Sequence, residues 1–591
     1  MNGTKGIYGL TVFVCITVFM QIVYRYDLMY REQLQLFLFT TPYALETVMQ
    51  PGGLSLYAAR FSVQFFLLPV AGPLITALLA VAAGLLTHAV LDRINRSAIN
   101  YMFGAVPVCF VIALHIDYNY NMQGTVAILF MLFALLVYTG IRRRWRRFVA
   151  GLLLIPTLYF VAGAIFSLFT LLALLWEFLK CKPRNDSVLL YIPVAALIGF
   201  LSLYAGSKGH LKFIMMPDAY YHIKLQSMTL YCLWLSFPAI ILLQQLTAAF
   251  AKRLPVFRFP LAAMLAATAI VAFLLLYKQH DKRLMPEKTR QDYFLRNCMW
   301  DRIIETFNAD KSDIAMMNVL NLALAQKGLL GDKMFAYGQD GHQTLICEYD
   351  RSHILAITLS DIYYHIGDIG SAQRYAMEGM TASYQYGNVR LLQRLAETNL
   401  LFGEYRAAEK YVAMLEQTLF YRTKGREYHR MLYNDNAVER DSVLGFKRKS
   451  LIHDDKYALS YSTSDLFEQL AISNPSCSLP VQYLLAMRLA NREMNVFRTL
   501  LDKYYGTEIL PSLGKNQQEA VMVMAMDDPA SRTKYGVSRR TADRFISFSR
   551  KMEISRLLTG AEEKAEVRKE IRQLFGDTCW YYLLFTDSGK K

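Results

Sequence analysis

The first 277 residues of the chain contain a series of apolar runs, each long enough to cross a lipid bilayer as a helix. About 20 apolar residues span the hydrocarbon core of a membrane, where only helices and closed barrels satisfy the backbone hydrogen bonds. The runs therefore predict an all-α membrane bundle. We expect single spans, the second of them kinked at Pro69 and Pro73, at 7–24, 62–91, 99–116, 123–141, 187–206, 227–250 and 261–277.

The apolar stretch 148–180 differs from the others because basic residues flank both of its ends. RRRWRR precedes it and KCKPR closes it. Positive charge marks the cytoplasmic side of a membrane protein, so both ends are expected on that side. We interpret the stretch as two short helices that turn at 162–164, which brings the predicted number of crossings to about nine.

The loops between these runs carry most of the excess positive charge. Residues 1–277 hold 20 Lys and Arg against 8 Asp and Glu, whereas residues 278–591 hold 44 against 40. With the N-terminus in the cytoplasm, fourteen basic residues fall on the cytoplasmic side and six on the other. This bias predicts that residues 278–591 lie outside, which for a bacterial inner-membrane protein is the periplasm. Residues 278–591 have no basic stripe with interleaved aromatic residues, so no nucleic acid is expected as a partner. Membrane lipid is expected as a partner because of the apolar runs in residues 1–277.

The soluble part, 278–591, contains an internal repeat. Residues 359–380 align without a gap on residues 395–416, so that Gly367 matches Gly403 and both copies share a small alanine five residues later. Weaker copies begin at Leu320 and Tyr483. The pattern of helix, glycine turn and helix with a small alanine resembles the tetratricopeptide repeat. The resemblance implies an α-solenoid whose groove holds a protein or peptide.

Residues able to do chemistry concentrate in the predicted outer loops, and the sequence contains no phosphate-binding loop, HExxH or GxSxG motif. The long first outer loop, 25–60, is expected to form two interfacial helices broken at 51–53. Carboxylates can act as general base or hold a divalent cation, and lysine or histidine can bind a diphosphate. The candidates are Asp27 and Glu32 in the first loop, His115 and Asp117 in the second, and Lys208, His210 and Lys212 in the third.

The layout of residues 1–277 resembles that of the GT-C membrane glycosyltransferases, a family that includes oligosaccharyltransferases. The shared features are a long first outer loop with an aspartate near its start, a short acidic second loop, many helices and a periplasmic domain. The resemblance implies transfer of a sugar from a polyprenyl-linked glycan to a protein or peptide acceptor in the repeat groove, or to an envelope glycan. The resemblance implies that Asp27 is either the general base or a ligand of Mg²⁺ or Mn²⁺. Asp117 would then be a second metal ligand, or would support Asp27 together with His115. No WWD, DxD or DxE motif is present.

A second resemblance covers most of the chain. The segments EQLQLF…PGGLSLYAARFSVQFF and NLALAQKG…MFAYGQDG are similar to an uncharacterised family of Bacteroidota membrane proteins, which implies no activity. Two other functions stay open: a non-enzymatic, membrane-anchored repeat scaffold for envelope assembly or secretion, and a flippase or transporter of a lipid-linked substrate. The candidate residues also have structural explanations. Asp27 suits an ion pair with Arg25 or Arg31, Asp117 suits a turn cap, and the lysines suit lipid headgroups.

Overall fold

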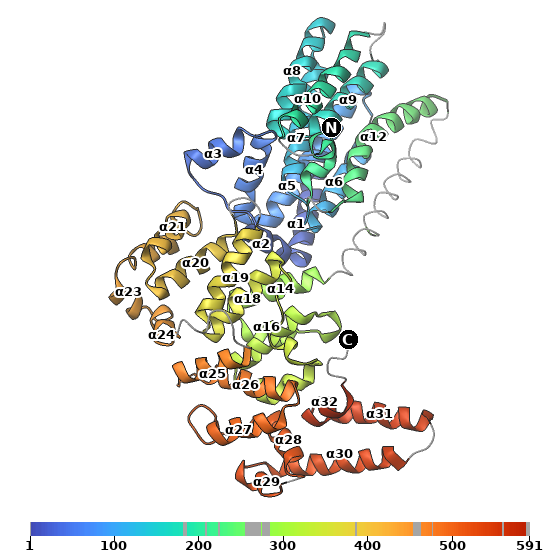
Figure 1. The fold of residues 1–591 in the computed structure, drawn as a ribbon. Helices are drawn as coiled ribbons and strands as arrows, with labels where there is room; N and C mark the ends of the chain where they lie inside the picture. Colours follow the sequence, from blue (N-terminus) through green and yellow to red (C-terminus); the bar gives the residue numbers. More distant parts are fainter. Residues whose placement is uncertain are drawn as a thin grey trace. The chain divides into compact units, whose positions relative to one another are not determined.

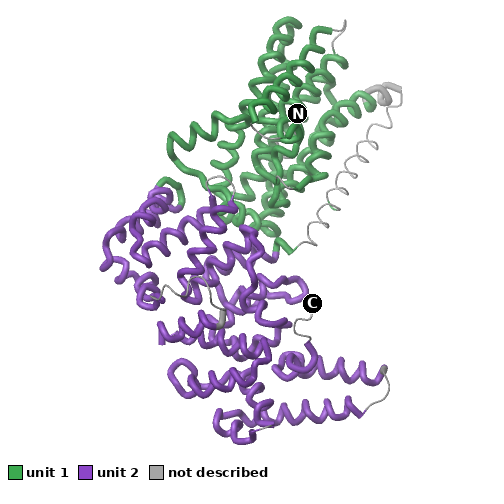
Figure 2. Tube along the Cα trace, viewed as in Figure 1, with its two compact units in different colours: residues 1–286, 417–420 green, residues 287–416, 421–591 purple. Residues whose placement is uncertain are grey.

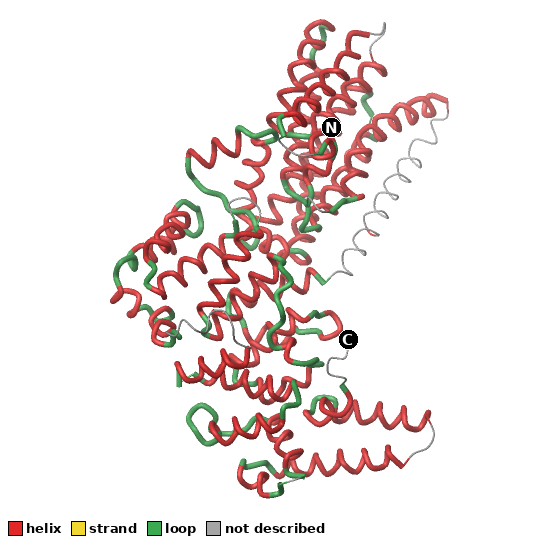
Figure 3. The backbone as a smooth tube through the Cα atoms, in the orientation of Figure 1, coloured by secondary structure: helices red, strands yellow, loops and turns green. Residues whose placement is uncertain are grey.

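The computed structural model describes residues 2–97, 99–180, 186–206, 210–222, 225–253, 274, 284–383, 387–452, 463–475, 477–526, 528–557 and 561–586. Helices joined by loops and turns make up these ranges (Figure 3). Within them, strand pairing is limited to two isolated bridges. The predicted all-α class is confirmed for the described part of the chain.

The chain divides into two compact units, coloured separately in Figure 2. Unit 1 comprises residues 1–286 and 417–420, and unit 2 comprises residues 287–416 and 421–591. Each unit buries its own apolar side chains. The helices of each are described separately.

Most of the described helices that could cross a membrane lie in unit 1, and one bent pair, Ile314–Gln326 with Leu330–Tyr337, lies in unit 2. Figure 1 labels the helices. Five segments are long and apolar enough to cross a membrane, and the number rises to seven if each of two bent helix pairs in the chain counts as one span. The predicted run 261–277 lies outside the described residues, apart from residue 274. The five segments are α5 (Ala71–Ile94), α7 (Gln123–Gly140), α8 (Arg144–Ala162), Asp186–Tyr204 with η2 (Asp186–Leu190) and α10 (Tyr191–Tyr204), and Met228–Thr247 of α12 (Met228–Arg253). These helices make the chain a membrane protein.

Unit 1 also contains the following helices. They are α1 (Asn2–Val23), α2 (Arg25–Gln33), α3 (Thr41–Val48), α4 (Gly53–Val63), η1 (Gln64–Leu67), α6 (Asn100–Ile116), α9 (Ile165–Lys180), α11 (Leu211–Met215) and η3 (Pro217–Tyr220). The first outer loop forms three helices, α2, α3 and α4, where two were predicted. The break between α3 and α4 falls at 49–52 and overlaps the predicted break at 51–53. Gly52 has a φ of +76° there, a conformation that favours glycine.

The predicted kinked span at 62–91 is wrong at its start. The chain ends α4 at Val63, passes through η1 and begins α5 at Ala71. Proline disfavours helical geometry at the residue before it, and Leu68, which precedes Pro69, is extended with a ψ of 129°. Pro73 lies in the first turn of α5, where its missing N–H costs no hydrogen bond. Pro69 therefore separates two helices and does not kink a single one.

The predicted turn within 148–180 is confirmed. Helix α8 ends at Ala162, α9 begins at Ile165, and Gly163 between them has a φ of +81°. The turn contacts the first outer loop, because the Gly52 N–H donates to the carbonyl oxygen of Tyr159 at 3.0 Å. A Cβ atom on Gly52 would lie 3.1 Å from the Gly163 Cα. Two glycines thus permit a close backbone approach between segments expected on the same face of the membrane.

The described part of unit 2 consists of helices, the longest of which, α30, has 19 residues. They are α14 (Met285–Arg296), α15 (Trp300–Thr306), η5 (Ala309–Lys311), α16 (Ile314–Gln326), α17 (Leu330–Lys333), η6 (Met334–Tyr337), η7 (His342–Thr344), α18 (His353–Ile366), α19 (Ile369–Ala382), α20 (Val389–Phe402), α21 (Tyr405–Glu416), α22 (Arg422–His429), α23 (Asp435–Arg440), α24 (Leu444–Lys449), α25 (Thr463–Ser473), α26 (Ser478–Ala490), α27 (Met494–Tyr504), α28 (Lys515–Met524), α29 (Ala530–Lys534), α30 (Arg539–Leu557), α31 (Ala561–Phe575) and α32 (Cys579–Phe585).

The two strongest sequence copies form consecutive helix hairpins, α18–α19 and α20–α21. Gly367 and Gly403 occupy the turns with φ values of +107° and +75°, so each ends its first helix in the left-handed conformation. Ala372 and Ala408 are fully buried on the second helices. The helices pack in chain order, α18 against α19, α19 against α20 and α20 against α21. The copy that begins at Leu320 departs from this form, because α17 has only four residues. The copy that begins at Tyr483 falls on α26 and α27, which pack against each other.

Replacing Ala372 or Ala408 with leucine is expected to destabilise the protein by about 1–3 kcal/mol, because each alanine fills its site and a larger side chain overpacks it. Thermal unfolding of the full-length protein, followed by circular dichroism, measures the loss. Ala382→Leu provides the control, since Ala382 is exposed at the end of α19. Equal melting temperatures for all three variants would contradict the tight packing of the hairpins.

Candidate functional site

The first part of the candidate site lies where the N-terminal helix breaks. Helix α2 leaves α1 at an angle of 77°. Asp27, Arg31 and Glu32 all lie on this short helix, and all three are buried. Asp27 belongs to the first turn, where a negative charge interacts favourably with the helix dipole. A nine-residue helix with three buried charged side chains directs its polar face into the protein, away from lipid and solvent.

Asp117 forms the second part of the site, at the C-terminal end of α6. Its carboxylate Oδ2 accepts a hydrogen bond of 2.6 Å from the Tyr221 hydroxyl, and Oδ1 accepts bonds of 3.1 and 3.2 Å from the backbone and side-chain N–H groups of Asn119. The Tyr120 N–H donates to the Asp117 carbonyl oxygen at 3.1 Å. Asp117 therefore has the turn-capping role considered above, and its carboxylate is held in a fixed orientation.

Arg31 joins the two parts. Its Nη2 donates a hydrogen bond to the carbonyl oxygen of Asp117. Its guanidinium interacts electrostatically with the carboxylates of both Asp27 and Asp117. One buried cation thus lies within electrostatic range of two buried carboxylates, those of Asp27 and Asp117. The sequence pattern identified Arg31 only as an ion-pair partner and did not indicate that it bridges two loops.

His115 lies behind this cluster in the last turn of α6 and is 1 % exposed. Its Nε2 is 3.0 Å from the Thr125 hydroxyl, which also lies 3.0 Å from the Tyr120 hydroxyl. The rings of His115 and Tyr120 meet edge to face at 5.5 Å. His115 is therefore packed as a buried support for the second outer loop.

The last residues of the third outer loop, 220–222, contact the second outer loop. The basic residues at the start of the third loop do not take part in this contact. The Asn121 N–H donates to the Tyr220 carbonyl at 3.0 Å, and the His222 N–H donates to the Asn119 carbonyl at 3.1 Å. This pairing carries Tyr221 to Asp117. Tyrosine in a loop gives no sequence signal for such a role, so Tyr221 was not predicted.

The predicted diphosphate-binding residues occupy the start of the same loop. His210 and Lys212 are exposed at the beginning of α11, and the Lys212 Nζ lies 4.9 Å from the centre of the Phe213 ring. Lys208 lies outside the described residues. At the far end, the Tyr220 hydroxyl donates to the Ala162 carbonyl at 2.6 Å and ties this loop to the α8–α9 turn.

The space at the cluster is small. A pocket lined by Arg31, Gln35 and Tyr120, among others, has a volume of about 20 Å³, which accommodates one water molecule. Among the described residues, no group of three or more His, Cys, Asp or Glu side chains gathers to hold a metal ion. We therefore derive no step through a metal.

Comparison with known proteins gives one result. Searches of curated proteins and of solved structures found no match. A family model matches residues 2–586, which is nearly the whole chain and includes both units. The resemblance to an uncharacterised family is thereby confirmed at the level of the family, while the sugar-transfer layout has no matched relative to support it. The chain belongs to a family of unknown function, DUF6057.

Proposed function

We propose that the chain is a membrane glycosyltransferase of GT-C type, which moves a sugar from a polyprenyl diphosphate carrier to a protein or glycan acceptor. The observation that supports this best is the convergence of Asp27 and Asp117 on Arg31 at the break after α1. Buried carboxylates beside a buried cation are costly for folding unless they are paired, and such clusters recur at catalytic sites.

The proposed reaction is a displacement at the anomeric carbon. A hydroxyl or amide of the acceptor attacks that carbon, and the bond between the sugar and the diphosphate oxygen breaks. The acceptor proton passes to the Asp27 carboxylate, and the departing diphosphate keeps the bonding electrons. Asp117 holds Arg31 in place, and the positive charges of Arg31 and of the loop with Lys208, His210 and Lys212 balance the diphosphate.

A polyprenyl-linked sugar is far larger than the water-sized pocket beside Arg31. The proposal therefore includes an opening of this pocket when the donor binds. Leu34 and Gln35, at the end of α2, line the pocket together with Val63 and Phe66, at the start of the segment that leads to α5. Movement of the short α2 relative to this segment would enlarge it. Lids and loops of this kind close over substrates in many enzymes.

We further propose nine membrane crossings, a cytoplasmic N-terminus, and a unit 2 that extends as a tetratricopeptide-like solenoid in the periplasm. Contacts among the predicted outer segments support this sidedness. The first loop bonds to the α8–α9 turn through Gly52, and the second loop pairs with the third through Asn121. The predicted inner ends also meet, because the Gln244 side chain donates to the carbonyl oxygens of Leu91 and Asn95 at 2.9 Å each.

Alkaline phosphatase fused after Lys278 is expected to be active, and the same reporter fused at Arg144 is expected to be inactive, because the enzyme folds only in the periplasm. The physical reason is the excess of Lys and Arg on the side that holds Arg144. Green fluorescent protein, which requires the cytoplasm, serves as the reciprocal control and should fluoresce only at Arg144. The opposite pattern would place the Asp27 cluster on the cytoplasmic face and exclude a periplasmic reaction.

Deletion of the gene in the source organism tests the function itself. Mass spectrometry of envelope proteins and glycans should show the loss of one sugar or glycan, and a plasmid copy of the gene should restore it. An unchanged profile in the deletion strain would remove the glycosyltransferase proposal, whatever the properties of the Asp27 cluster.

A membrane-anchored scaffold is the second candidate function. The consecutive hairpins α18–α19 and α20–α21 favour it, since stacked helix pairs present a continuous surface to a partner chain. This function predicts an unchanged glycan profile in the deletion strain, together with a protein that is crosslinked to unit 2 in wild-type cells.

A further inference from the structure

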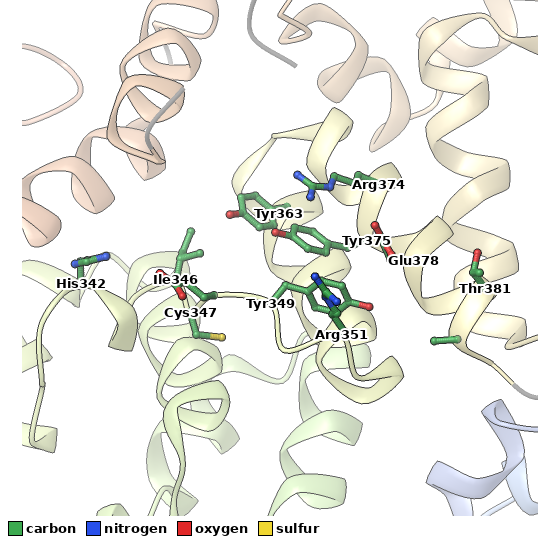
Figure 4. Close-up of a pocket in the computed structure, with 12 residues that line it drawn as sticks. His342, Ile346, Cys347, Tyr349, Arg351, Tyr363, Arg374, Tyr375, Glu378 and Thr381 are labelled. Atoms are coloured by element: carbon green, nitrogen blue, oxygen red, sulfur yellow. The ribbon is translucent and has the colours of Figure 1, made fainter. Parts of the chain in front are cut away.

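Unit 2 contains a second cavity, separate from the Asp27 cluster. Its volume is about 660 Å³, within the range of cavities that hold small molecules. The walls come from the segment 342–351 and from helices α18 and α19 (Figure 4). The side chains that matter for recognition are Tyr349, Tyr363 and Tyr375, with Glu348, Arg351, Arg374 and Glu378.

The tyrosines form a continuous aromatic wall. The ring of Tyr375 stacks on that of Tyr363, with centroids 5.4 Å apart and an angle of 17° between the planes. Tyr349 meets the same Tyr375 ring edge-on at 5.4 Å. Tyr363 is 7 % exposed and fixes the wall from behind, whereas Tyr349 and Tyr375 are half-buried and present part of their rings to the cavity.

The tyrosine hydroxyls remain donors at neutral pH. Burial raises the pKa of Tyr349, and the nearby carboxylates of Glu378 and Asp350 raise it further. Burial also raises the pKa of Tyr375, against the effect of Arg374. Both side chains are therefore protonated under physiological conditions and can donate a hydrogen bond to a ligand.

The carboxylates and guanidinium groups that line the cavity are two of each kind. Arg351 and Arg374 supply donors, Glu348 and Glu378 supply acceptors, and all four side chains are exposed. The Arg374 guanidinium lies 5.6 Å from the centre of the Tyr375 ring. The two positive and two negative charges cancel. Such a lining offers both kinds of hydrogen-bonding group without selecting a ligand of either charge.

We propose that this cavity binds a neutral saccharide. A sugar ring has an apolar C–H face that packs on an aromatic ring, and its hydroxyls both donate and accept hydrogen bonds. The tyrosine wall matches the face, and the arginines and glutamates match the hydroxyls. A phosphate would be attracted by the two arginines and repelled by the two glutamates. The inference goes beyond sugar transfer and does not depend on it, because it uses only residues of unit 2.

Binding of neutral and anionic oligosaccharides to the purified full-length protein tests this inference. The protein is solubilised in lauryldimethylamine oxide, which carries no sugar, and is applied to an array of glucan, mannan and chitin fragments, sialylated and sulfated glycans, and tyrosine-rich and proline-rich peptides. Calorimetric titration of the best neutral fragment then gives a Kd. We expect neutral fragments to bind, and Tyr375→Ala to weaken binding roughly three- to tenfold, the equivalent of one lost aromatic contact.

Two further variants make the result unambiguous. Glu378→Gln alters an exposed acceptor without disturbing the fold and should also weaken binding. Tyr433→Ala, at a tyrosine that is 62 % exposed elsewhere in unit 2, should leave the Kd unchanged. If Tyr375→Ala unfolds the protein, the effect of Glu378→Gln on the Kd tests the inference instead. No neutral binding, a preference for anionic glycans or for peptides, or a Kd unaffected by Glu378→Gln would each overturn the inference. The binding assay contains no polyprenyl diphosphate sugar donor, so its outcome does not test the proposed sugar transfer.

Discussion

Replacing Asp27 with asparagine is expected to slow sugar transfer roughly 10²–10⁴-fold, the usual loss when a general base is removed. Asparagine keeps the shape of the side chain but accepts no proton at neutral pH. Arg31 retains its hydrogen bond to the Asp117 carbonyl, so the second outer loop should stay in position. The measurement is the transfer of radiolabelled sugar from a polyprenyl diphosphate donor by purified protein, with membrane abundance checked by immunoblot.

Two other variants separate catalysis from a general effect of charge. Glu46→Gln removes an exposed carboxylate of α3, in the same outer segment, and should transfer sugar at the wild-type rate. Asp117→Asn should also lower the rate, because the Asp117 carboxylate balances Arg31. A wild-type rate for Asp27→Asn would exclude Asp27 as the base and leave Glu32, buried on the same helix, as the next carboxylate to test.

Features encoded locally could be predicted from the sequence. The turn at Gly163 follows from an apolar stretch too long for one span and from a glycine free to adopt a positive φ. The hairpins follow from a 36-residue repeat with glycine at each turn. The predicted start of α5 is wrong because hydropathy does not include the restriction that Pro69 places on the backbone conformation of Leu68.

The candidate site could be predicted only in part, because it depends on contacts between distant residues. Arg31 and Asp117 are 86 residues apart, and Asp117 and Tyr221 are 104 apart. Outer-loop position and residue chemistry are enough to nominate the carboxylates. They do not reveal which arginine bridges them or which tyrosine holds Asp117. Pairing across such separations is set by how the helices pack.

Replacing Asp361 with alanine is expected to destabilise the protein by about 3–5 kcal/mol, the usual effect of removing one partner from a buried charge network. The Asp361 carboxylate, on α18, accepts hydrogen bonds from Arg390 and, at 2.9 Å, from Arg394. Both arginines lie on α20 and bond to one further carboxylate each, Arg390 to Asp292 at 2.6 Å and Arg394 to Glu397 at 2.7 Å. Without Asp361, each buried guanidinium loses a partner at the junction of the two hairpins.

Unfolding in urea at neutral pH measures this loss, with Asp301→Ala as the control. Asp301 pairs with Lys327 at 3.0 Å on the surface, where an ion pair contributes less than about 1 kcal/mol. A midpoint for Asp361→Ala equal to that of the control would show that the network does not stabilise unit 2.

The pH dependence of the same measurement provides an independent test. Burial alone would raise the pKa of the Asp361 carboxyl, but Arg390 and Arg394 outweigh it and hold the pKa below its usual value. A carboxyl with a lowered pKa stabilises the fold above its unfolded pKa, about 3.9, and that contribution disappears as the pH falls through the folded pKa. The difference in unfolding free energy between wild type and Asp361→Ala should therefore be constant near neutral pH and shrink below about pH 4. A difference that grew with acid would mean that the carboxyl is held protonated, and would reverse the assignment of charge in this network.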